Sequence, residues 1–297
     1  MPFSEFISYL EFEKKYAIHT VTAYKNDLES FLSFTSEEFD YDEIKTVHYS
    51  IIRSWIVALV DEGISNRSIN RKISSLKTYY KFLLKTKQIE VSPLVKHKAL
   101  KTAKKLQVPF SEKEIDTVLN ILAQEKGFDG IRNKLIVELF YSTGIRRTEL
   151  VNLKMNDVSI SQKTIKVLGK RNKERIIPLI SSVLNTIEKY ISYREDLEII
   201  KDKDYFFLSR KGVKIYETLV YRVINNYFSK ASEKVKKSPH ILRHSFATHL
   251  LNEGADLKAL KELLGHTSLA STQVYTTNSI AKLKEVYKHS HPRNSSK

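Results

Sequence analysis

Apolar residues recur at three- and four-residue steps through much of the first hundred residues. That spacing places them on one face of an amphipathic helix, so it predicts helices over residues 20–34, 46–60 and 66–85. The last of these carries one apolar row, formed by Ile69, Ile73, Leu76, Tyr80 and Leu83. We therefore expect residues 1–90 to form a helical first domain.

A strongly basic stretch follows Pro93 and reads LVKHKALKTAKKLQVP. It holds five lysines (96, 98, 101, 104 and 105), contains no acidic residue and closes on Pro109. Such a composition is typical of an exposed connection between domains. We predict a basic linker over residues 91–108 and a second domain over residues 109–297.

The second domain begins with a helix-start signal, because Ser111 is followed three residues later by Glu114. Helical periodicity then continues to Phe140, and it is interrupted at KTIKVLGKRNKERIIPLI. Alternating Ile165 and Val167, followed by a polar turn and a β-rich stretch, predict a hairpin with Lys170, Arg171, Asn172 and Lys173 at its tip. Helical patterns resume afterwards, so the expected fold is mainly α with a small β-hairpin (α+β).

Charge narrows the class of partner. The 297 residues include 50 Lys and Arg against 34 Asp and Glu, a net charge of +16 with a pI near 9.6. A field of this sign favours a polyanion such as nucleic acid, although an anionic membrane surface, an acidic protein or simple solubility also fit.

The chain has no cysteine, which excludes disulfides and cysteine-ligated zinc and suits a reducing cytoplasm. Its apolar runs are too short and too charged to span a bilayer, and its first residues do not resemble a signal peptide. We expect a cytoplasmic protein with no membrane partner.

Basic side chains gather where they can follow a nucleic-acid backbone. Arg67 and Arg71 lie four residues apart on a predicted helix, although a solvated helix face explains such a row equally well. With lysines of the linker and cations of the hairpin, they form a set of candidate DNA contacts: Arg67, Arg71, Lys101, Lys104, Arg171 and Lys173.

Four short segments carry candidate chemistry. In YSTGIRRTEL, Arg146 follows Gly144, and Glu149 is placed to hold its guanidinium by a bidentate contact. The second segment is the hairpin tip with Lys170, which in isolation reads as a solvent-exposed turn residue.

The third segment is HILRHSFATHL, in which His240 and Arg243 share a helical face behind Pro239. Arg243 lies beside an apolar stripe, so it needs an anionic partner. We expect structural roles for His244 and His249. In the fourth segment, LLGHTSLASTQVY, Gly265 ends a helix and is followed by His266 and Tyr275.

A metal site is the alternative for these histidines, because His240 and His244 are four residues apart. No third ligand follows, and two-metal nucleases need clustered carboxylates where this set is cationic. Phosphodiester transfer suits two arginines, a lysine, two histidines and a tyrosine better. Guanidiniums match the planar transition state, and a covalent phosphotyrosine conserves the bond energy without ATP. We expect no metal and no cofactor.

Together these motifs resemble the tyrosine recombinase (phage integrase) family, and most closely its bacterial Xer subfamily, with the XerC branch favoured over XerD. The matching positions, in chain order, are Arg146, Lys170, His240, Arg243, His266 and Tyr275. The first domain resembles the helical core-binding (SAM-like) domain of that family. Ile145, Thr148 and Arg171 depart from its usual residues without removing a catalytic group.

The resemblance implies a C-shaped clamp on double-stranded DNA and a role for each of the six positions. Arg146 and Arg243 would hold the scissile phosphate, Lys170 would protonate the leaving 5′ oxygen, and Tyr275 would be the nucleophile. His240 would manage the tyrosine proton, and His266 would hydrogen-bond the phosphate.

The resemblance also implies partners and a biological role. They are a dif-like DNA site, a sister XerD-like recombinase in a cyclic heterotetramer, an FtsK-like DNA translocase, and the resolution of chromosome dimers before cell division. Three other functions stay open: an integrase of a phage or conjugative element, a relaxing topoisomerase, and a non-catalytic architectural DNA-binding protein.

Overall fold

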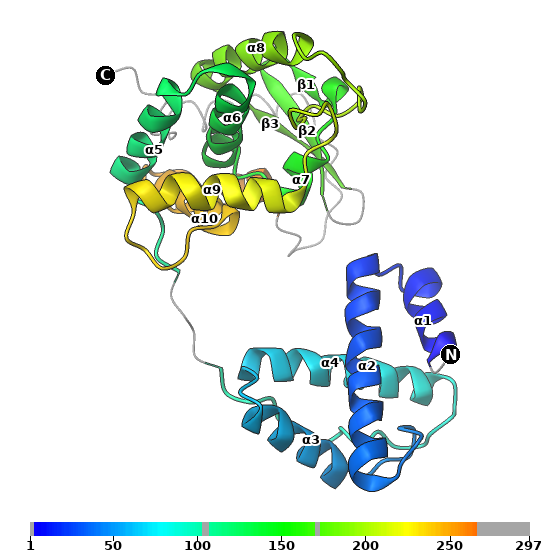
Figure 1. Cartoon of the computed structure of the whole chain (residues 1–297). Helices are drawn as coiled ribbons and strands as arrows, with labels where there is room; N and C mark the ends of the chain where they lie inside the picture. The colour runs from blue at the N-terminus through cyan, green and yellow to red at the C-terminus, as the bar shows by residue number, and fades with distance from the viewer. Residues whose placement is uncertain (1–2, 103–106, 170–172, 266–297) are drawn as a thin grey trace. The chain divides into compact units, whose positions relative to one another are not determined.

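The computed structural model describes residues 3–102, 107–169 and 173–265 (Figure 1). The chain divides into two compact units, Met1–Lys105 and Leu106–Lys297, each with its own hydrophobic core. None of the helices in the described ranges is long and apolar enough to cross a membrane.

The first unit contains helices and connecting segments, and no strand, within its described residues. Its elements are α1 (Ser4–Ser8), a π-helical turn (Tyr9–Glu13), α2 (Ile18–Phe39), α3 (Tyr49–Asp61) and α4 (Asn66–Lys85). The apolar faces predicted from the periodicity meet in one core, where the rings of Phe31 and Trp55 lie 4.8 Å apart. The three helices expected from the sequence are confirmed. The helix α2 extends beyond both predicted ends, α3 begins three residues later and ends one residue later than predicted, and α4 has the predicted bounds.

The segment after α4 packs partly against this unit instead of leaving it at once. Leu94 is buried in the first core, and the side chains of Asn66 and Asn70 donate to the carbonyl oxygens of Lys101 and Leu100, each at 2.9 Å. The Leu100 amide in turn donates to the Asn70 side chain at 2.9 Å. Side-chain amides of α4 thus fix the course of the chain as far as Lys101.

The second unit combines helices with a small sheet. Its helices are α5 (Glu112–Gln124), α6 (Gly127–Thr143), α7 (Arg147–Val151), a 3₁₀ turn (Met155–Asp157), α8 (Ser181–Glu195), α9 (Glu217–Ala231), α10 (Pro239–Asn252) and α11 (Leu257–Leu264). The capping box predicted at Ser111 and Glu114 is present at the start of α5. The central helix α6 is largely buried and packs against α5, α8 and α10 (Figure 1).

The predicted hairpin is confirmed and belongs to a three-stranded antiparallel sheet in the order β1-β2-β3. The strands are β1 (Val158–Ser159), β2 (Thr164–Leu168) and β3 (Glu174–Pro178). Val167 pairs with Arg175, and Ile165 pairs with Ile177. All four side chains are buried, so the inward face of β3 carries a charged residue beside an apolar one.

Candidate active site

Arg146 is positioned by the turn between α6 and α7. Gly144 ends α6 in the left-handed conformation, with φ of 58°, and Ile145 anchors the turn in the core. Arg146 then caps α7, and its main-chain N–H donates to Glu149 Oε2 at 2.8 Å. Its Nη1 donates to Glu149 Oε1 at 2.8 Å, and its Nη2 donates to the Gly265 carbonyl at 3.0 Å.

Arg243 lies on the buried side of α10, with 9% of the residue exposed. Its guanidinium donates to the main-chain carbonyl of Gly144, and also to that of Leu264 at 2.7 Å. Burial, followed by the nearby charge of Arg146, lowers its pKa to about 10, so it remains protonated at neutral pH. Both acceptors are uncharged, so neither bond neutralises the Arg243 charge.

A pocket of about 140 Å³ joins the two arginines to His240 at the first turn of α10. Its walls come from α6, the α6–α7 turn, the start of α7, α9, and α10 with its N-cap: Phe140, Ile145, Arg146, Arg147, Tyr221, Ser238, Pro239, His240 and Arg243. The amide groups at a helix N-terminus favour an anion, and guanidiniums match phosphate geometry. The pocket therefore suits a phosphate group. A larger cavity of about 580 Å³ along α9 contains none of the candidate site residues.

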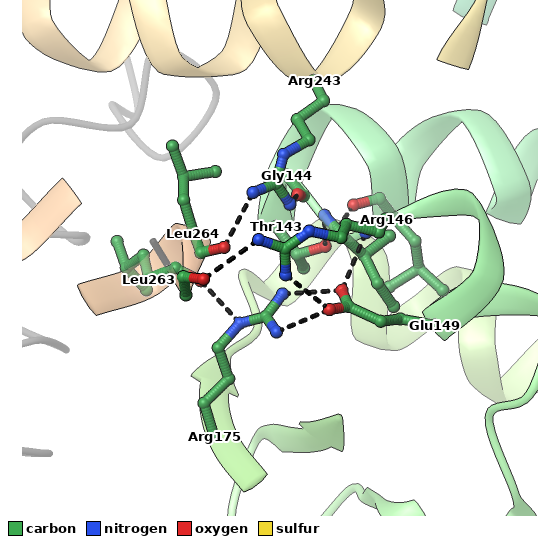
Figure 2. A network of polar contacts seen from close by, with 11 residues as sticks. Thr143, Gly144, Arg146, Glu149, Arg175, Arg243, Leu263 and Leu264 are labelled. Atoms are coloured by element: carbon green, nitrogen blue, oxygen red, sulfur yellow. Dashed lines mark hydrogen bonds and ion pairs between the residues drawn. The ribbon is translucent and has the colours of Figure 1, made fainter. Parts of the chain in front are cut away.

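A third arginine, which the sequence motifs did not single out, completes the polar network drawn in Figure 2. Arg175 donates from Nη1 and Nη2 to the two carboxylate oxygens of Glu149, at 2.8 and 2.7 Å. The bidentate partner of Glu149 is thus Arg175, whereas Arg146 makes a single side-chain contact with it. One sequence signal was available, because strand alternation places Arg175 on the same inward face as Ile177.

Glu149 is buried among these cations. Burial alone raises the pKa of its carboxyl, but the hydrogen bonds and charge of Arg175, together with the bonds from Arg146, lower the pKa to about 2. Glu149 is therefore ionised at neutral pH. Three guanidiniums surround one carboxylate, which leaves the cluster positively charged.

The remaining histidines of the HILRHSFATHL segment lie away from the pocket. His249 is buried, and its Nδ1 is 2.9 Å from the hydroxyl of Tyr141. Burial is the main cause that lowers the pKa of His249. His244 is exposed and, like His249, does not line the pocket.

Several predicted residues fall outside the described part of the chain, namely Lys104, Lys170, Arg171, His266 and Tyr275. Their neighbours in sequence are described. The Gly169 amide donates to the carbonyl of Lys173 at 2.8 Å, which closes the hairpin end of the sheet, and the Lys173 side chain is exposed. Gly265 caps α11 in the left-handed conformation, as the sequence predicts.

The first unit holds the other predicted DNA contacts that the structure describes. Arg67 and Lys101 are exposed. Arg71 pairs with Asp27, a carboxylate that is only 2% exposed and also accepts from Ser75 at 2.7 Å. Arg71 therefore stabilises the α2–α4 packing, whatever else it contacts.

Comparison with known proteins gives the family. The Phage integrase family model matches residues 109–282, and the model for the phage integrase N-terminal SAM-like domain matches residues 3–87. The chain belongs to the phage integrase family, and its enzymatic class is site-specific tyrosine recombinase.

Curated relatives cover nearly the whole chain. The tyrosine recombinase XerC of Chlorobaculum parvum is 36% identical over 312 residues, which span 97% of this chain and 93% of the relative. The tyrosine recombinase XerC of Anoxybacillus flavithermus is 38% identical over 291 residues, which span 97% and 96%.

Solved structures share the fold. XerH recombinase bound to its palindromic difH substrate, in a post-cleavage complex, aligns with a TM-score of 0.71 and 20% identity over 93% of this chain and 78% of that one. The integrase of transposon Tn1549 in complex with transposon right end DNA also aligns with a TM-score of 0.71, at 20% identity over 93% and 96%.

Proposed function

We propose that this recombinase cuts and rejoins duplex DNA through a 3′-phosphotyrosine bond to Tyr275, with Arg146 and Arg243 holding the scissile phosphate. The observation that carries the proposal is the convergence of these two guanidiniums with His240 on one small pocket at the N-terminus of α10. A guanidinium has five N–H donors, so each arginine keeps donors for a phosphate beyond those that it uses in bonds to the protein.

Charge development in the reaction explains the need for two arginines. Attack on phosphorus produces a pentacoordinate transition state whose non-bridging oxygens carry negative charge. Preorganised donors stabilise that charge without reorganising, and each such donor is typically worth on the order of 10²–10³ in rate. His240 lines the same pocket, and we propose that it accepts and returns the tyrosine proton.

The roles of Lys170, His266 and Tyr275 rest on their match to the family pattern. The Tyr275 oxygen bonds to phosphorus, and the bond from phosphorus to the 5′ oxygen breaks. Lys170 gives that oxygen a proton, while His266 hydrogen-bonds the phosphate. Attack by the 5′ hydroxyl of another strand reverses the step, so no net bond energy is lost. We propose that no metal ion or cofactor takes part.

The biological role we propose is the resolution of chromosome dimers at a dif-like site. The XerC relatives and the XerH complex with difH support this assignment. A sister XerD-like recombinase would complete a cyclic heterotetramer on two DNA duplexes, and an FtsK-like translocase would activate it. Because the bacterial chromosome is the substrate, we place the protein in the cytoplasm.

Covalent trapping tests the chemistry. A nicked duplex that carries the host's dimer-resolution site is incubated in EDTA with wild-type protein or Tyr275→Phe, with and without the sister recombinase. We expect an adduct on a denaturing gel with the wild type only. An adduct that survives in Tyr275→Phe moves the nucleophile elsewhere. Intact binding with no adduct under any condition favours the architectural role instead.

An integrase of a mobile element is the second candidate, and the fold of the Tn1549 integrase favours it. Deletion of the gene separates the two roles. Dimer resolution predicts filamentous cells with unsegregated chromosomes, which wild-type protein rescues and Tyr275→Phe does not. An integrase predicts normal division and adducts only on the element's attachment sites. A relaxing topoisomerase would form adducts equally well on random duplexes.

A further inference from the structure

We infer that Arg175 is a positioning residue for strand cleavage, which aligns Arg146 through the Glu149 carboxylate and fixes the end of α11. This inference rests on the proposed phosphate clamp. It concerns a side chain of β3 that lies outside the six matched positions and the pocket lining.

The Arg175 side chain is not available to contact DNA directly. It is 4% exposed, and it donates from all three of its nitrogen atoms to protein oxygens. Two bonds go to Glu149, and the third runs from Nε to the Leu263 carbonyl at 2.8 Å. An arginine buried and bonded in this way can affect cleavage only through the groups that it positions.

Its first neighbour is the carboxylate that orients Arg146. Both Glu149 oxygens accept from Arg146 as well, one from the side chain and one from the main chain. A bidentate arginine fixes the plane of a carboxylate, so Arg175 sets the plane against which Arg146 is held. Its charge also offsets that of Glu149, which would otherwise neutralise Arg146. Arg146 and Arg243 thereby keep a net positive field for a phosphate.

Its second neighbour is the C-terminal end of α11. Three consecutive main-chain carbonyls there accept from three different arginines: Leu263 from Arg175, Leu264 from Arg243 and Gly265 from Arg146. The negative end of a helix dipole strengthens such bonds. In the sequence, His266 follows directly. Arg175 thus ties β3 to the helix that leads into the segment with His266 and Tyr275.

The surroundings of Arg175 leave little room for movement. A Cβ atom at Gly265 would lie 3.2 Å from Arg175 Nη1, and one at Gly169 would lie 3.6 Å from the same atom. Gly169 immediately precedes Lys170 in the hairpin. The Arg175 guanidinium therefore lies close to two glycines, each adjacent in sequence to a matched position.

The test compares Arg175→Gln and Arg175→Lys with Arg194→Gln in single-turnover cleavage of the nicked dimer-resolution duplex from pH 5 to 9. Arg194 is a matched control because it is 6% exposed in the same unit and donates to the carbonyls of Lys203 and Tyr205, away from the pocket. DNA affinity and urea stability are measured for each variant.

We expect Arg175→Gln to slow cleavage on the order of 10²-fold, as small misplacements of reacting groups do, with DNA affinity nearly unchanged. Its cleavage rate should also fall toward acidic pH (an acidic limb in the pH profile), because the still buried Glu149 has lost the bonds that keep its pKa low. The limb should vanish in Arg175→Gln/Glu149→Gln. Arg175→Lys should recover part of the rate, and Arg194→Gln should show no limb.

Equal rate losses in Arg175→Gln and Arg194→Gln at matched stability, with no acidic limb, would overturn the inference. If Arg175→Gln does not fold, the pH profile of Arg175→Lys takes its place, because a lysine ammonium cannot make the bidentate contact of the guanidinium. A loss of rate at acidic pH in Arg175→Lys supports the inference, and its absence overturns it. The wild type separates the two claims. Absence of any wild-type adduct removes the proposed function, whereas a wild-type adduct with unaltered Arg175 variants removes the positioning role alone.

Discussion

The Nη2 group of Arg243 donates to the carbonyl oxygen of Leu264 at 2.7 Å and thereby joins α10 to the end of α11. A carboxylate in that place would neutralise the arginine. The main-chain carbonyl satisfies the donor but leaves the charge, so a buried cation remains available to an incoming phosphate. Arg146 likewise donates to the Gly265 carbonyl, although it also pairs with the Glu149 carboxylate. In the proposed mechanism, these main-chain bonds position the two arginines for the scissile phosphate.

The turn at Gly144 predicts the first mutational outcome. A Cβ atom there would lie 2.5 Å from Phe246 Cδ1 and 2.7 Å from Leu264 Cδ2, at a φ of 58°. We expect Gly144→Ala to destabilise the fold by about 1–3 kcal/mol from overpacking, in addition to backbone strain, and to slow cleavage. Urea denaturation and single-turnover cleavage measure the two effects.

Gly63→Ala is the matched control, since Gly63 also has a positive φ, of 77°, but nothing lies within 4 Å of its added Cβ. It should show the backbone strain alone, with normal cleavage per folded molecule. Equal stability losses in the two variants would contradict the packing argument.

The depressed pKa of Glu149 predicts how stability depends on pH. A carboxyl group whose pKa falls from 4.5 to about 2 on folding stabilises the protein above pH 4.5, and this contribution is lost as the pH falls toward 2. We expect Glu149→Gln to be less stable than wild type by roughly 3 kcal/mol at pH 7. The gap should narrow between pH 4.5 and pH 2.

Urea unfolding at pH 7, 4.5 and 3 measures this gap, with the exposed Glu188→Gln on α8 as control. A gap that stays constant from pH 7 to pH 3 would show that the ionised Glu149 carboxylate is not what stabilises the fold.

The ion pairs of α4 predict different contributions of Arg67 and Arg71 to DNA binding. Arg67 forms no ion pair within the described ranges, whereas the charge of Arg71 is already offset by Asp27. We expect Arg67→Ala to lower the slope of log K against log salt by about 1, through the loss of one phosphate contact. Arg71→Ala should lower the slope less but destabilise the first unit, because Asp27 is buried.

Salt titrations of binding to specific and random duplexes check this prediction. Lys45→Ala, whose lysine pairs with Glu43 at 2.9 Å, serves as control. A larger slope change for Arg71→Ala than for Arg67→Ala would mean that Asp27 releases the arginine to DNA.

Apolar periodicity predicted much of the fold, because most helices bury one apolar face and the hairpin strands alternate. The helix α6, which is largely buried, is an exception. The helix over residues 66–85, the cap at Ser111 and the hairpin around Gly169 follow from local pattern alone. The composition of the basic stretch 91–108 predicts exposure, and its described lysines are exposed. It does not indicate that Leu94 is buried in the first core or that Asn70 of α4 bonds to Leu100.

Some residues of the candidate site could also be predicted from local sequence, and others could not. Arg146 and Arg243 could be named from motifs because each lies in a distinctive local sequence. Arg175 has no such motif, and its role depends on contacts across 26 residues to Glu149 and 88 residues to Leu263. Sequence alternation could place Arg175 facing inward, but only the tertiary structure identifies its partners.

In the proposed mechanism, the charges of Arg146 and Arg243 stabilise the scissile phosphate during cleavage. The most direct measurement is single-turnover adduct formation by wild type and Arg243→Ala on two nicked duplexes, one with a normal scissile phosphate and one with a neutral methylphosphonate. With the normal phosphate, the variant should lose on the order of 10²–10³ in rate, and with the methylphosphonate the loss should be much smaller. An equal loss on both substrates would mean that Arg243 supports the fold and does not stabilise the charge of the reacting phosphate.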